Sequence, residues 1–113
     1  MAIPTKKARG TIGSWYADVD GERLPVVHKY WLKNGRYSDP EARPSDPLFV
    51  EFVEKVRSAG MVILQKDKDP QHNEKGQTVL MREGYIAVFA VDSIELDKEG
   101  FRFRVTDRVC HLK

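Results

Sequence analysis

Alternation of apolar and polar residues predicts a β-hairpin near the N-terminus. The segment GTIGSWYADVDGERLPVVHKYWLK, residues 10–33, contains two strand-like runs on either side of Asp20-Gly21. An Asp-Gly pair between such runs is a strong hairpin signal, because both residues tolerate the positive φ angles of a two-residue turn. With this turn, the numbers of facing residues sum to 41, so His28 faces Gly13.

One face of the predicted hairpin is more apolar than the other, and we expect it to point into the core. This face carries His28, and we expect Trp15 and Tyr30 beside it to anchor the core. Thr11 faces Tyr30 in the same register. The opposite face is expected to point outwards and carries Tyr16, Arg23, Lys29 and Trp31.

A helical period follows a proline-rich connector at residues 34–47. Asp46 is a good N-cap and Pro47 suits the first helical position. The helix is predicted over residues 47–59, and Gly60 supplies its left-handed end. Its apolar stripe has the spacing i, i+3, i+4 and i+7 and consists of Phe49, Phe52, Val53 and Val56.

The rest of the chain has the pattern of strands joined by turns. A polar loop is predicted at residues 67–77, and turns are predicted at Glu83-Gly84 and at residues 97–100. In the last strand Phe101, Phe103, Val105 and Val109 alternate with polar residues. The predicted strands are residues 61–66, 78–82, 85–96 and 101–109.

The resulting order is β-β-α-β-β-β-β, which predicts an α+β fold. We expect a strongly bent or barrel-like antiparallel sheet with one helix packed on it. Residues 1–9 are predicted to be a flexible basic arm, and residues 10–113 a single domain.

Two stretches resemble a known group of small barrels. A helix leads into MVILQK, and a strand like GYIAVFAVDSIE follows a polar loop. Over residues 48–96 this pattern resembles PUA-like barrel modules, particularly the ASCH and EVE types. The resemblance implies a barrel that binds RNA, DNA or a modified base, usually without catalysis. It rests on pattern, so it assigns no pocket residue.

Composition excludes few functions. The 113 residues are 41% hydrophobic and 32% charged, and 19 basic against 17 acidic side chains give a net charge of +2. This net charge is no evidence for or against nucleic-acid binding; only a cluster of basic residues would be evidence for it. The single cysteine, Cys110, allows no internal disulfide and suggests a reducing compartment. With no signal peptide and no apolar run long enough for a membrane, we expect a cytoplasmic protein without membrane contact.

His28 is the polar group of greatest interest. It can be a pocket base or a donor that orients a ligand beside Trp15 and Tyr30. It can equally be a partly buried histidine with a hydrogen-bonded neighbour, placed opposite Gly13 because glycine leaves room. The sequence leaves both interpretations open.

Basic and aromatic residues supply a candidate nucleic-acid surface. Stacking on exposed aromatic rings and phosphate contacts from arginine are the usual means of binding single strands. Arg102, Arg104 and Arg108 form a stripe on the last strand, although Glu95 or Asp97 can neutralise it across the hairpin. The candidate binding residues are His28, Lys29, Tyr30, Trp31, Trp15, Arg102, Arg104 and Arg108.

No motif identifies a metal, cofactor or catalytic site. The histidines and Cys110 lack a recognised ligand spacing, and no cofactor is expected. We therefore expect a non-catalytic module that binds single-stranded RNA or DNA, or a modified nucleobase. The alternative is a protein-interaction or self-association module that forms a homodimer through its exposed aromatic face. A third hypothesis is a small enzyme that uses His28 with Asp18.

Overall fold

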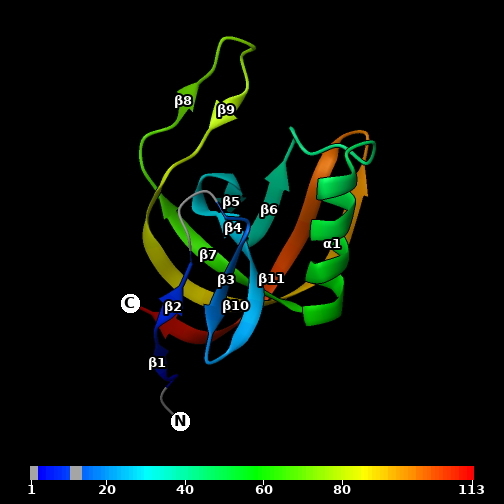
Figure 1. Cartoon of the computed structure of the whole chain (residues 1–113). Coiled ribbons are helices and arrows are strands. Elements are labelled where there is room, and N and C mark those ends of the chain that lie inside the picture. Colours follow the sequence, from blue (N-terminus) through cyan, green and yellow to red (C-terminus); the bar gives the residue numbers. More distant parts are fainter. Residues whose placement is uncertain (1–2, 11–13) are drawn as a thin grey trace.

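The computed structural model describes residues 3–10 and 14–113 (Figure 1). These residues form the helix α1 (Pro47–Ala59), a 3₁₀ turn at Lys29–Trp31 and a set of strands. The strands are β1 (Thr5–Lys6), β2 (Ala8–Arg9), β3 (Tyr16–Val19), β4 (Glu22–His28), β5 (Leu32–Lys33), β6 (Arg36–Asp39), β7 (Met61–Asp67), β8 (Gln71–His72), β9 (Thr78–Val79), β10 (Arg82–Asp97) and β11 (Gly100–Leu112).

The β3–β4 hairpin confirms the predicted turn and register. Asp20 and Gly21 have φ angles of 52° and 78°, and Val19 pairs with Glu22. Positive φ at both positions is the geometry of a type I′ turn, whose twist matches that of the flanking strands. The predicted partners of His28 and Tyr30, Gly13 and Thr11, lie outside the described residues.

The prediction that the second strand of this hairpin continues beyond His28 is wrong. Residues Lys29–Trp31 form a 3₁₀ turn, and the chain then enters β5 and a second hairpin. Asn34 and Gly35 form that turn with φ angles of 51° and 77°. The connector predicted at residues 34–47 therefore contains a strand, β6, because Asn-Gly is itself a strong hairpin signal.

The helix prediction is confirmed at both ends. The Asp46 side chain accepts a hydrogen bond from the Leu48 N–H, and Pro47 is the first helical residue. Gly60 adopts the left-handed conformation with φ of 66°, and its N–H bonds to the Val56 carbonyl. These local contacts satisfy some of the backbone groups that a helix leaves free at each end.

The main sheet is mixed, which corrects the prediction of an antiparallel one. Its strand order is β2-β3-β4-β7-β10-β11-β6-β5, with β1 added beside β11. The pairs β4–β7 and β1–β11 are parallel. The parallel β4–β7 pair arises because the long connection through α1 returns the chain in the same direction. The sheet does not close into a barrel within the described residues.

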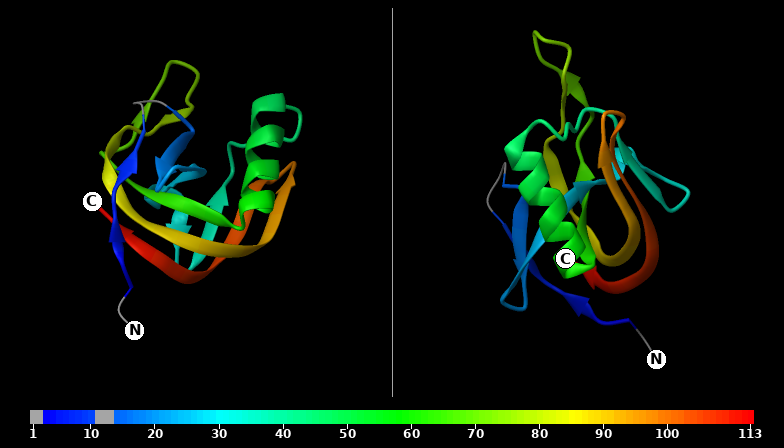
Figure 2. Two further views of the ribbon diagram at one scale, coloured as in Figure 1. Left: turned by 60° about the horizontal axis from the view of Figure 1, so that its bottom comes forward. Right: turned by 90° about the vertical axis from the view of Figure 1, so that its right-hand side faces the viewer.

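Strands β10 and β11 bend sharply, as Figure 2 shows. Their register shifts between Val88 and Phe89, between Ala90 and Val91, and between Asp92 and Glu95. Such bulges bend a strand and reverse the faces of the residues beyond them. The alternation predicted for residues 101–109 consequently fails at Val109, which is 39% exposed while Cys110 is buried.

The predicted turn at Glu83-Gly84 is also wrong. Gly84 lies inside β10, where a register shift with β7 absorbs it. Predicted strand 78–82 is divided between β9 and the start of β10, and the predicted loop 67–77 contains β8. Strands β8 and β9 pair with each other and project from the body of the molecule (Figure 1).

Hydrophobic packing occurs on both faces of the central strands. On one face Val27 and Leu64 pack with the buried stripe of α1, and on the other Val26 and Ile63 pack with Val88. A continuous apolar run such as MVIL in β7 is typical of a strand covered on both sides. Residues 5–6 and 8–9 of the predicted basic arm form β1 and β2, which pair with β11 and β3.

Candidate functional site

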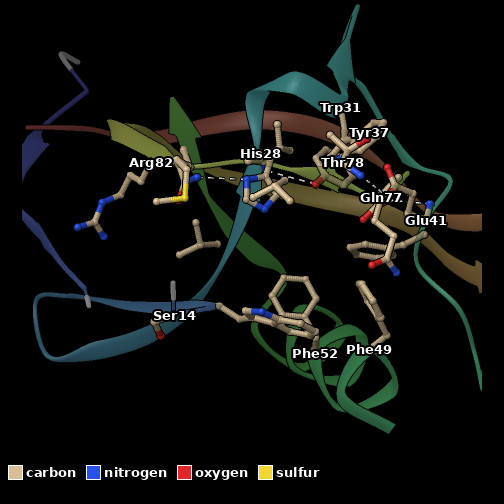
Figure 3. A pocket seen from close by; sticks show the side chains of 18 of the residues that line it. Ser14, His28, Trp31, Tyr37, Glu41, Phe49, Phe52, Gln77, Thr78 and Arg82 are labelled. Atoms are coloured by element: carbon tan, nitrogen blue, oxygen red, sulfur yellow. Dashed lines mark hydrogen bonds between the residues drawn. The ribbon is translucent and has the colours of Figure 1, made fainter. Parts of the chain in front are cut away.

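A cavity of about 450 Å³ lies between α1, β4, β6 and the β8–β9 hairpin. Its volume lies in the range of small-molecule sites. Figure 3 shows His28, Trp31 and Tyr37 on one side of the cavity and Phe49 and Phe52 on the other.

The cavity wall combines six aromatic side chains with polar and aliphatic ones. The Trp15 ring lies 5.0 Å from that of Phe49 and 5.6 Å from that of Phe52, measured between centroids. Phe49 and Phe52 are three residues apart on α1, so the helix presents both on one face. Walls of this kind favour a flat ring, because offset and edge contacts add to the area that a ligand buries.

His28 is the central polar group, and its partners come from β7. The β4–β7 register places His28 beside Gln65, and Asp67 ends the same strand. Nδ1 of His28 lies 2.9 Å from Oδ1 of Asp67. A carboxylate only accepts hydrogen bonds, so Nδ1 carries the proton and donates it. In the neutral ring Nε2 is then an acceptor that remains for the cavity.

Three donors converge on the Asp67 carboxylate. Besides His28, Gln65 Nε2 donates at 2.8 Å and the Tyr30 N–H donates at 3.1 Å. Burial by itself would raise the pKa of Asp67, but these hydrogen bonds outweigh it and hold the pKa below its usual value. Asp67 therefore stays ionised and fixes the orientation of the His28 ring.

The other end of the cavity carries acidic and amide groups. Oε1 of Glu41 accepts a hydrogen bond from the Thr78 N–H at 2.9 Å, which joins the segment after β6 to the β8–β9 hairpin. Burial raises the pKa of the neighbouring Asp39, and the Glu41 charge adds to this effect. Figure 3 shows Gln77 beside Glu41 at this end.

Tyr37 links the His28 strand to the core. Its hydroxyl oxygen accepts the His28 N–H at 3.2 Å, and its ring stacks on Phe103 at 4.6 Å. Burial raises the pKa of Tyr37 well above its usual value. The hydroxyl therefore stays protonated and remains a donor near the cavity.

The structure brings three of the predicted binding residues to the cavity, namely His28, Trp15 and Trp31. Lys29 and Tyr30 are exposed on the 3₁₀ turn, and Tyr30 packs edge-on against Trp31 at 4.8 Å. Neither of these two lines the cavity.

The expected division of the aromatic residues is wrong. Trp15 and Tyr30, predicted to anchor the core, are 37% and 41% exposed. Tyr16 and Trp31, predicted to point outwards, are partly buried and pack against the core. The 3₁₀ turn at residues 29–31 changes the direction of the side chains, so the strand alternation does not reach Tyr30 and Trp31.

The three arginines of β11 lie away from the cavity lining. Arg102 bonds to Glu95 and Asp97, the partners anticipated from the sequence. Arg104 forms a two-pronged pair with Asp92 at 2.9 and 2.7 Å. Arg108 lies over the Phe89 ring, 5.2 Å from its centroid. Carboxylates thus already occupy donors of Arg102 and Arg104.

Several cavity residues were not anticipated from the sequence. Gln65, Glu41 and Gln77 line the cavity, and Asp67 contacts its His28; these residues come from segments interpreted as a strand, a connector and a loop. The only local signal was Asp67 at the end of an apolar strand. Its partnership with His28 depends on the parallel pairing of β4 and β7, which no local pattern reveals.

No protein-family model matches this chain, and neither a curated protein nor a solved structure gives a significant match. No group of three or more His, Cys, Asp or Glu residues suited to a metal ion occurs in residues 3–10 and 14–113. In the same ranges, no helix has the length and apolar character needed to cross a membrane.

Proposed function

We propose that this protein is a binding module whose cavity takes a planar heterocycle of the nucleobase type, free or within a nucleic acid. The observation that carries the proposal is a cavity with aromatic walls and a histidine held by Asp67 at its centre. Proteins that read an unstacked base combine stacking on aromatic rings with hydrogen bonds to the base edges. This agrees with the function implied by the PUA-like resemblance, which stays a prediction.

The walls and the polar groups have complementary tasks. Phe49 and Phe52 supply an apolar face against which a ring packs, Trp15 extends this face, and Trp31 lies on the opposite side of the cavity. His28 offers Nε2 to the ligand, and its side chain is 33% exposed, so a ligand can reach it.

The proposal includes a cytoplasmic location. Cys110 is a buried free thiol, which fits a reducing compartment of that kind.

Tryptophan fluorescence provides the test, since Trp15 and Trp31 both line the cavity. The protein is titrated with nucleosides and with short single-stranded RNA and DNA, at low and at moderate salt. We expect saturable quenching by a nucleoside with little dependence on salt. Oligonucleotides should bind more weakly as salt rises, because phosphate contacts release counterions.

A matched pair of variants on α1 locates the response. Phe49→Ala removes a cavity wall, and we expect it to weaken nucleoside binding roughly 5- to 100-fold, the range for losing one stacking ring. Leu48→Ala, at a neighbouring residue that is 61% exposed and outside the cavity lining, should bind as the native protein does. Absence of quenching by every nucleoside and oligonucleotide would refute the proposal.

A second candidate function is acid–base catalysis, favoured by the Asp67–His28 hydrogen bond. A carboxylate that orients a histidine is a common arrangement for removing a proton from a bound hydroxyl or water. The same titration samples are incubated and analysed by mass spectrometry. If the native protein alters the ligand chemically and His28→Ala does not, catalysis is established. If the native protein leaves the ligand unaltered, the result supports binding alone.

Self-association through an outer aromatic face receives less support. Tyr16 and Trp31, expected on that face, pack against the core. A homodimer would therefore need a different surface. Size-exclusion chromatography of the same samples measures the oligomeric state and tests this alternative.

A further inference from the structure

The end of the cavity near Glu41 holds both hydrogen-bond donors and acceptors. Asn73 Oδ1 accepts the N–H groups of Lys75 at 2.9 Å and Gln77 at 3.0 Å. This fixes the Asn73 amide, whose Nδ2 donates to Gln77 Oε1 at 2.9 Å. The Gln77 oxygen is thus engaged, and its Nε2 remains as a donor.

Glu41 provides acceptors next to that donor. One of its oxygens accepts the N–H of Thr78, the residue after Gln77, at 2.9 Å. This bond holds the two side chains at the same end of the cavity, as Figure 3 shows. The second carboxylate oxygen makes no hydrogen bond to the described residues, and neither does Glu41 form a salt bridge with them. At this end of the cavity Gln77 therefore supplies a donor and the Glu41 carboxylate supplies acceptors.

We propose that the cavity selects a guanine-type base, with O6 accepting from Gln77 Nε2 and with N1–H and the 2-amino group donating to the Glu41 carboxylate. This inference rests on the proposed function and names the class of base. Donor, acceptor, acceptor is the complement of the guanine edge. Adenine instead places its N1 lone pair towards the carboxylate, and uracil offers one N–H between two carbonyl oxygens.

The aromatic walls suit the same ligand. A purine stacks over more area than a pyrimidine, and the cavity of about 450 Å³ has room for it. A site that hydrogen-bonds a polar edge rejects an analogue without that edge, because the groups that the bound ligand covers lose their partners.

The test compares guanosine, inosine and adenosine by tryptophan quenching. Inosine differs from guanosine only in lacking the 2-amino group, so the native protein should bind it about 10- to 100-fold more weakly, as expected for one hydrogen bond to a charged group. Adenosine should bind more weakly still. Equal affinity for the three nucleosides, or a preference for adenosine, would overturn the guanine assignment while leaving the proposed function intact.

Glu41→Gln probes the carboxylate directly. The amide oxygen can still accept the Thr78 N–H, and we expect the ratio of guanosine to adenosine affinity to fall about tenfold or more. The control is Glu74→Gln, which makes the same charge change at an exposed residue of the β8–β9 hairpin and should leave the ratio unchanged. An unchanged ratio in Glu41→Gln would refute the assignment. If that variant does not fold, the inosine comparison on the native protein still decides.

Discussion

Asp67→Asn is the most informative perturbation of the cavity, because it removes the charge on which three donors converge. The Asp67 side chain is 5% exposed and accepts from His28, Gln65 and the Tyr30 N–H. An asparagine keeps one acceptor oxygen and adds an N–H₂ group that faces existing donors. Each buried donor left without a partner costs about 1–3 kcal/mol, so we expect a loss of roughly 2–4 kcal/mol in the free energy of unfolding.

The effect should depend on pH with a definite sign. The pKa of Asp67 in the folded protein lies below its usual value of 3.8. A depressed carboxyl pKa stabilises the fold above the unfolded pKa, and this contribution is lost as pH falls through the folded pKa. The difference between native protein and variant should therefore be full at about pH 7 and shrink below about pH 4.

Urea denaturation at several pH values measures both quantities. Asp69→Asn is the control, since Asp69 lies in the exposed loop after β7 and should change stability little. A loss in Asp67→Asn smaller than about 0.5 kcal/mol at neutral pH, the usual size for a surface change, would show that the Asp67 network does not stabilise the fold. A difference that does not change between neutral and acidic pH would contradict the assigned pKa direction.

Three further changes test other parts of the fold. Gly100→Ala should destabilise the fold by about 3 kcal/mol, because Gly100 has φ of 121° and a Cβ there would clash with the Asp39 carbonyl oxygen. The control is Gly84→Ala, whose Cβ meets no atom within 4 Å, and equal losses of the two variants in urea denaturation would contradict this prediction. Asp46→Ala should cost about 1 kcal/mol through loss of the helix cap, measured in the same way, and no loss would show that the cap is not needed. Arg104→Ala should lower Tm by no more than about 4 °C, because its pair with a carboxylate is exposed; a much larger fall by differential scanning fluorimetry would contradict this.

Local sequence signals predicted the parts of this fold that local interactions decide. The Asp20-Gly21 turn, the cap of α1 at Asp46 and the helix end at Gly60 all occur where the sequence places them. Each depends on backbone conformations and hydrogen bonds within a few residues. Such preferences hold whatever the rest of the chain does.

Longer strands were predicted less well, because their faces depend on pairing. The bulges in β10 and β11 reverse the alternation before Val109, and a register shift absorbs Gly84. A bulge is fixed by the neighbouring strand and by the curvature of the sheet, so no count of alternate residues reveals it. The 3₁₀ turn at residues 29–31 had the same effect on Tyr30 and Trp31.

The sequence by itself marked His28 as an unusual polar group within an apolar strand, and it left the role of that group open. Only the tertiary structure placed Asp67, 39 residues away, at 2.9 Å from its ring. The same holds for Thr78 and Glu41, which are 37 residues apart. Turns and caps follow from short-range preferences, whereas the cavity depends on parallel pairing through α1 and on one projecting hairpin. Those arrangements minimise the free energy of the whole chain, and no short segment encodes them.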